Sequence, residues 1–151
     1  MADLGEQRLN VLRRRAVVTL TLLVIQFLLG MGTNLFVMIP THHSGAGAGP
    51  FLSGIVASLL WSFSSGLPVL IAHVVLGIVL LLSAIDLVVH AVRSRRAAAI
   101  WLTAGGLVGI VMAAINGASF LKYGLDVNSM LMSAGFAIAL LCYVFVLVLR
   151  G

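Results

Sequence analysis

Four long apolar runs restrict what this chain can fold into. They cover residues 16–39, 67–92, 97–121 and 127–149. A helix needs about 20 apolar residues to cross the hydrocarbon core of a bilayer, and each run reaches that length. Charged residues make up only 9% of the chain, against about 25% in a soluble domain. We therefore predict an all-α integral membrane protein: one membrane domain over residues 1–151, a four-helix bundle in contact with the lipid bilayer.

The basic residues lie at the ends of these runs. With four spans, all of them except Lys122 fall on one side of the membrane: before the first run, between the second and third, and after the fourth. Because Lys and Arg are enriched in cytoplasmic segments, we predict that both termini are cytoplasmic and that the protein lies in the cell membrane. Positive charge placed this way sets topology, and it gives no reason to expect a nucleic-acid partner.

The N-terminal basic cluster before the first run is similar to the start of a signal peptide. The apolar run that follows is longer than the roughly 7–15 residues of a signal sequence, so we expect it to remain as a helix. The single cysteine, Cys142, excludes a disulfide within the chain and any CxxC motif. Phosphate-binding loops, GxSxG and HExxH are absent from the sequence, so we assign no catalytic residue.

A shorter apolar run follows the first predicted span. Residues 41–50 alternate Gly with Ala and end in Pro, and they predict a flexible loop on the outer side. Residues 51–63 are apolar but too short to span a membrane. Gly54, Ser58 and Ser62 recur at every fourth position, with large apolar residues on the opposite side. We therefore predict a short amphipathic helix lying on the outer surface.

Polar residues inside the predicted spans concentrate near the outer surface. The spans alternate in direction, so Asn34, His73, Asn116, Met130 and Met132 fall at a similar depth. His73 is the most informative of these, because a titratable ring within a span needs a partner, a cofactor or water. Three interpretations of His73 stay open: a structural histidine hydrogen-bonded to Asn34, Asn116 or a carbonyl, a ligand for haem or a metal, and a proton relay or substrate contact.

A haem site around His73 has support from its surroundings. A neutral imidazole is the commonest metal ligand and binds haem iron through one ring nitrogen. Gly77 lies one turn further along the helix, where a missing side chain leaves room for a planar macrocycle. The second axial ligand is open among His42, His43, Met130 and Met132.

Two further groups of side chains could carry chemistry. His42 and His43 could bind Cu or Zn outside the membrane, although a solvated loop is the simpler interpretation. Asp86 and His90 are spaced so that their side chains can meet on one helix, close to Arg93. We predict a polar cluster at the inner surface there, separate from His73, with a proton pathway as the alternative.

The third span carries a strip of small residues at every fourth position: Gly105, Gly109, Ala113 and Gly117. Such a strip lets another helix approach closely in lipid. It is either a seam within the bundle or a contact surface for a homo-oligomer, a larger membrane complex or a cofactor.

The first two spans resemble one half of a haem A synthase-type membrane protein, or more loosely a four-helix cytochrome b. The resemblance covers residues 23–30, a Gln followed by Leu-Leu-Gly, then Gly32-Thr33-Asn34, an outer loop with a short helix, and residues 72–77 around His73. It implies a four-helix bundle with haem b held in the outer leaflet. The family's acidic residue, cysteine pair and histidine of the fourth helix have no counterpart here.

Three functions therefore remain. The first is a haem-binding membrane protein, for electron transfer, haem handling or sensing, with its site around His73. The second is a non-catalytic subunit or assembly partner of a larger membrane complex. The third is a small oligomeric transporter, which has the least support because broken helices and acidic rings at mid-membrane are missing.

Overall fold

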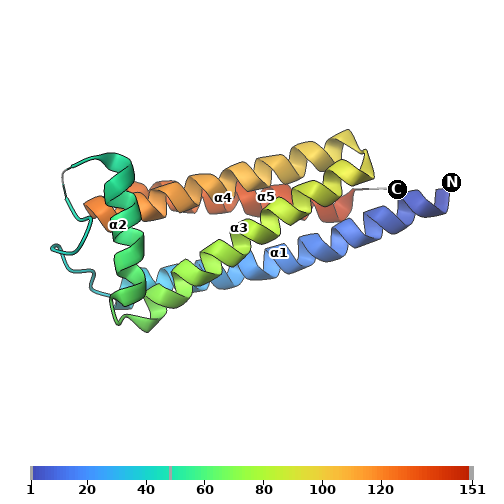
Figure 1. The fold of residues 1–151 in the computed structure, drawn as a ribbon. Coiled ribbons are helices and arrows are strands. Elements are labelled where there is room, and N and C mark those ends of the chain that lie inside the picture. Colours follow the sequence, from blue (N-terminus) through green and yellow to red (C-terminus); the bar gives the residue numbers. More distant parts are fainter. Residues whose placement is uncertain (1, 48, 150–151) are drawn as a thin grey trace.

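The computed structural model describes residues 2–47 and 49–149, and over these residues the chain is entirely helical apart from its connections (Figure 1). The helices are α1 (Ala2–Phe36), α2 (Phe51–Ser64), α3 (Pro68–Ser94), α4 (Ala97–Tyr123) and α5 (Asp126–Val148). Helices α1, α3, α4 and α5 are long and apolar enough to cross a membrane, and α2 is a shorter apolar helix. The prediction of an all-α, multi-pass membrane protein is confirmed at this level.

Helix α1 begins well before the first predicted span. Its N-terminal turns carry the basic cluster, since arginine is a good helix former and nothing in this segment interrupts a helix. Leu9, Leu12 and Ala16 are fully buried there, so tertiary packing holds these turns in place as well. At the other end of the chain, Arg150 lies outside the described residues.

The four long helices form a ring in the order α1, α3, α4, α5, with α1 diagonal to α4 and α3 diagonal to α5 over the described residues. One end of the ring holds the start of α1 and the connection between α3 and α4, and we call it the basic end. The other holds residues 37–50 and α2, and we call it the loop end. Figure 1 shows the α1–α3 pair and the α4–α5 pair coming apart toward the loop end, where α2 crosses from one pair to the other.

The buried core lies toward the basic end and follows a seven-residue pattern. Its positions on the first two long helices are Leu9, Leu12, Ala16, Thr19 and Leu23 of α1, and Leu80, Ala84, Leu87 and Ala91 of α3. Spacings that alternate between three and four residues are typical of helices that pack with interlocking side chains at a shallow crossing angle. A hydroxyl pair adds to this packing, since Thr19 Oγ1 lies 2.8 Å from Ser83 Oγ.

Helices α4 and α5 pack closely, backbone against backbone. A methyl group on Gly109 would lie 2.6 Å from the carbonyl oxygen of Gly135, and one on Gly135 would lie 2.5 Å from that of Gly109. Neither position can hold a side chain without moving a helix. The turn between the two helices is tight, with Gly124 in the left-handed region at φ 65°.

The remaining members of the small-residue strip face α5 too. A side chain at Gly105 would meet Cys142 Sγ at 3.1 Å, and one at Gly117 would meet Met132 Sδ at 3.0 Å, while the backbone nitrogen of Ala113 lies against Gly135. The strip is therefore a seam within the bundle. It is not available as the oligomer or complex surface that the sequence also allowed.

Helix α2 turns its small residues inward. Ser58 and Ser62 are 0% exposed, whereas Leu52 is 74% exposed and Val56 and Leu60 are also open. Gly54 faces Lys122 of α4, and a methyl group at that position would displace the end of the lysine side chain. The helix is found where the sequence predicts it, but its polar side is covered by the rest of the chain and does not face water.

Candidate functional site

His73 lies on the face of α3 that packs against α1. The inward-facing positions of α3 continue toward the loop end as half-buried Gly77 and His73 and buried Leu70, at the same three- and four-residue spacing as the core. The matching positions of α1 are Gln26, Gly30 and Thr33. The two polar side chains therefore meet inside the seam between these helices.

Two glycines make space for the two polar side chains. A methyl group on Gly30 would lie 3.0 Å from His73 Cε1, so the imidazole rests on bare backbone of α1. A methyl group on Gly77 would lie 3.1 Å from Gln26 Nε2, so the amide rests on bare backbone of α3. His73 Nε2 lies 3.4 Å from Gln26 Nε2, at the long end of hydrogen bonding.

This pair leaves polar atoms without partners. His73 Nδ1 and Gln26 Oε1 are buried and have no hydrogen-bond partner among the described residues. If the Gln26 amide donates to His73 Nε2, a neutral ring carries its proton on Nδ1, which is then a free donor beside the free amide oxygen. If the amide is turned over and accepts from the ring, Nδ1 becomes a free acceptor and the amide nitrogen a free donor. Either way, one donor and one acceptor remain open in a low-dielectric region, where each costs several kcal/mol.

Asn34 and Asn116 do not join this pair. Asn34 is exposed on α1. The positions of α1 that face α3 continue from Leu23 to Gln26, Gly30 and Thr33 at spacings of three or four residues. Asn34 does not belong to this series. Asn116 Nδ2 donates to its own helix at Met112 O, 2.8 Å away. The polar layer expected from depth alone is therefore dispersed around the bundle.

The two candidate methionine ligands lie on α5, diagonally across the ring from α3. Met130 is 63% exposed and faces away from the bundle. Met132 places its sulfur against Gly117 of α4. Because His73 faces α1, neither methionine shares a space with its imidazole.

The two loop histidines differ sharply from each other. His42 is exposed, whereas His43 stacks on Trp61 of α2 with ring centroids 4.1 Å apart. His43 Nε2 lies 3.0 Å from Leu121 O, and Nδ1 lies 3.0 Å from Ser44 O. Both nitrogens face carbonyl oxygens, so His43 anchors the loop to α2 and α4.

Sequence reasoning left Gln26 and Gly30 out of the predicted site, although both belong to the quoted first-helix pattern. The signal that identifies them is the seven-residue spacing of apolar and small residues along α1, which places Gln26 and Gly30, and not Asn34, on the seam.

Comparison with protein families, with curated proteins and with solved structures finds no match for this chain. Among the described residues, no three His, Cys, Asp or Glu side chains gather as a metal-binding group. The His73–Gln26 pair is thus the candidate site on its own geometry.

Proposed function

We propose that this multi-pass membrane protein binds haem b through one axial bond from His73, close to the loop end. The observation that carries the proposal is the buried imidazole nitrogen Nδ1, which has no partner among the described residues. When the Gln26 amide accepts from the ring at Nε2, Nδ1 is an open acceptor. Such a nitrogen inside a membrane bundle is suited to ligating a metal, because coordination removes the cost of burying it unpaired.

The side chains around His73 leave one imidazole nitrogen open and place the Gln26 amide next to the ring. Gln26 fills the space beside Gly77, and its side chain has to turn away for a macrocycle to approach the imidazole. A second protein ligand is not at hand, because Met130 is exposed and Met132 packs on Gly117. His73 alone would hold the haem here. Electron-transfer haems are typically held by two protein ligands, so a single ligand would favour haem handling or sensing.

The test is haem titration of the full-length protein purified in detergent, followed by absorption spectroscopy. We expect a Soret band that saturates at one haem per chain, and we expect His73→Ala to abolish it. His42→Ala is the matched control, since His42 is exposed in the loop. A wild-type protein that stays colourless in excess haem, or a band that survives His73→Ala, contradicts the proposal.

A second candidate is a lipophilic ligand with a hydrogen-bonding head group, such as a quinone. The observation that favours it is the amide of Gln26, whose open oxygen a metal at His73 leaves unexplained. Gln26→Ala separates the two candidates. For haem the substitution clears space and leaves the Soret band intact, whereas for a hydrogen-bonded ligand both Gln26→Ala and His73→Ala weaken binding.

The assembly-partner alternative loses its main surface, because the small-residue strip is occupied by α5. It remains a prediction that rests on the other exposed faces of the bundle.

A further inference from the structure

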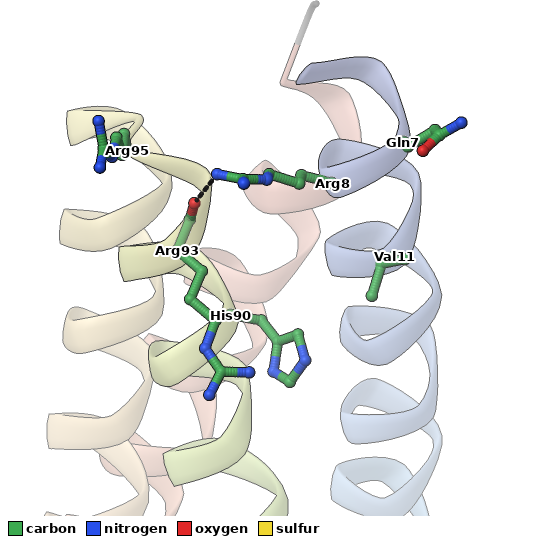
Figure 2. A pocket seen from close by; sticks show the side chains of 6 residues that line it. All are labelled: Gln7, Arg8, Val11, His90, Arg93 and Arg95. Atoms are coloured by element: carbon green, nitrogen blue, oxygen red, sulfur yellow. Dashed lines mark hydrogen bonds between the residues drawn. The ribbon is translucent and has the colours of Figure 1, made fainter. Parts of the chain in front are cut away.

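A second feature lies at the basic end, far from His73 along the helices. A pocket of about 480 Å³ opens between the first turns of α1 and the last turn of α3. Its lining residues are Gln7, Arg8, Val11, His90, Arg93 and Arg95. Figure 2 shows Arg8 and Arg95 at its upper rim, with the Arg93 side chain reaching down toward the His90 ring and Val11 on the facing side of α1. We call it the basic pocket.

The charge of the basic pocket is not balanced by a carboxylate in its lining. Arg8 Nη1 donates to the carbonyl oxygen of Arg93, 2.8 Å away, which holds the guanidinium in place without neutralising it. Asp86, one turn before His90, forms an ion pair with Arg15 of α1, and its backbone oxygen lies 2.9 Å from His90 Nδ1. Glu6 is exposed and outside the lining.

The polar cluster expected around Asp86 and His90 thus forms, with Arg15 as its cation where Arg93 was expected. As a result, Arg93 remains in the lining of the basic pocket.

Arg95 points to a role for this rim. It is the only non-glycine residue of the described chain with positive φ, at 56°, where it ends α3 in the left-handed region. That helix-ending position favours glycine, since a side chain there is strained. Arg95 therefore adopts this conformation at a backbone cost, and it lines the basic pocket together with Arg8 and Arg93.

The position of the basic pocket along the helices indicates where its ligand comes from. The pocket lies at the end of helices that cross the membrane, at the level of lipid head groups. Val11, at its deeper side, is exposed, and Val18 on the same face of α1 is exposed too. Guanidinium groups above an open apolar surface match a phosphate head group attached to acyl chains.

We propose that the basic pocket binds the phosphate group of an anionic phospholipid from the leaflet at the basic end. The arginines of the lining, Arg8, Arg93 and Arg95, surround the phosphate with positive charge, and the acyl chains run along α1 past Val11. This site does not depend on the proposed function at His73.

The experiment measures lipid binding to the detergent-purified full-length protein by native mass spectrometry and thermal unfolding. The probes are dioleoyl phosphatidylglycerol, dioleoyl phosphatidylcholine and sodium phosphate. We expect phosphatidylglycerol alone to bind and raise the unfolding midpoint. Arg95→Gly is expected to weaken that binding about five-fold, because each basic residue near an anionic membrane surface adds to the electrostatic attraction for the lipid. It also relieves the backbone, so the midpoint without lipid stays equal or rises, which excludes misfolding as the cause.

The matched control is Arg14→Gln, which removes one exposed charge from α1 outside the pocket. Arg93→Gln is the second pocket variant and is expected to weaken binding to a similar extent as Arg95→Gly. The proposal is overturned if Arg14→Gln weakens binding as much as the pocket variants, since general surface charge then accounts for it. It is also overturned if phosphatidylcholine binds equally well, or if sodium phosphate alone reproduces the effect, which would make free phosphate the ligand.

Discussion

At the scale of single residues, two glycines determine what His73 can do. Gly30 brings the imidazole against the backbone of α1, and Gly77 does the same for the Gln26 amide against α3. The ring is therefore held by shape and by one long polar contact, with Nδ1 open. The ring is held in place, but its Nδ1 has no hydrogen-bond partner among the described residues.

We predict that Gly30→Ala displaces the His73 ring. The added methyl group would lie 3.0 Å from His73 Cε1, so either the ring turns or the helices separate. We expect a loss of about 1–2 kcal/mol in unfolding free energy, as for other overpacked sites, together with weaker haem binding. Thermal unfolding and haem titration measure the two effects.

The control for this substitution is Gly5→Ala on the same helix, where the added methyl group meets nothing within 4 Å. Alanine there is expected to be neutral or slightly stabilising. If Gly30→Ala and Gly5→Ala give the same unfolding free energy and the same haem binding, His73 does not pack closely on α1.

At the scale of helices, the molecule consists of two pairs held together by different means. Helices α4 and α5 meet backbone to backbone through Gly109 and Gly135, whereas α1 and α3 interlock through larger side chains. Lipid provides no hydrophobic drive between helices, so close van der Waals contact is the main source of stability for α4 and α5.

We predict that Gly109→Val is among the most damaging single substitutions in α4. Its first carbon would lie 2.6 Å from the Gly135 carbonyl oxygen, and a backbone atom cannot rotate away. The expected loss is about 3 kcal/mol or more, seen as a lower unfolding midpoint in detergent. Ala114→Val is the matched control, because Ala114 lies on the exposed face of the same helix. If the two variants have equal unfolding midpoints, α4 and α5 do not pack through Gly109.

At the scale of the whole molecule, four helices long and apolar enough to cross a membrane separate the basic end from the loop end. Among the described residues, every Lys and Arg except Lys122 lies toward the basic end. Lys122 is only 3% exposed, with Nζ 3.4 Å from Pro50 O beneath α2. The exposed positive charge of the described residues is therefore concentrated at the basic end.

We predict that the basic end faces the cytoplasm. Single cysteines introduced in a Cys142→Ser background test this in intact cells. A membrane-impermeant maleimide is expected to label Ser44→Cys in the outer loop at once, and Glu6→Cys only after permeabilisation. Both positions are exposed in the folded chain, so accessibility to the reagent decides the result. The reverse pattern would show the opposite topology.

The sequence by itself determined the local elements. Length and composition of the apolar runs were enough to locate four spans and the short helix between the first two, because these depend on residues close together in the chain. The bounds of α1 differed, since Leu9 and Leu12 extend its packing beyond the membrane-length run.

Only the tertiary structure decided which faces meet. Depth in the membrane can be read from residue order, and depth put His73 level with Asn34, Met130 and Met132. The ring order and the rotation of each helix depend on packing summed over the whole bundle, and they turned His73 toward Gln26 and Gly30. The same long-range packing buried Ser58 and Lys122, which in isolation belong to polar surfaces, because the outer loop and α2 fold back over the end of α4.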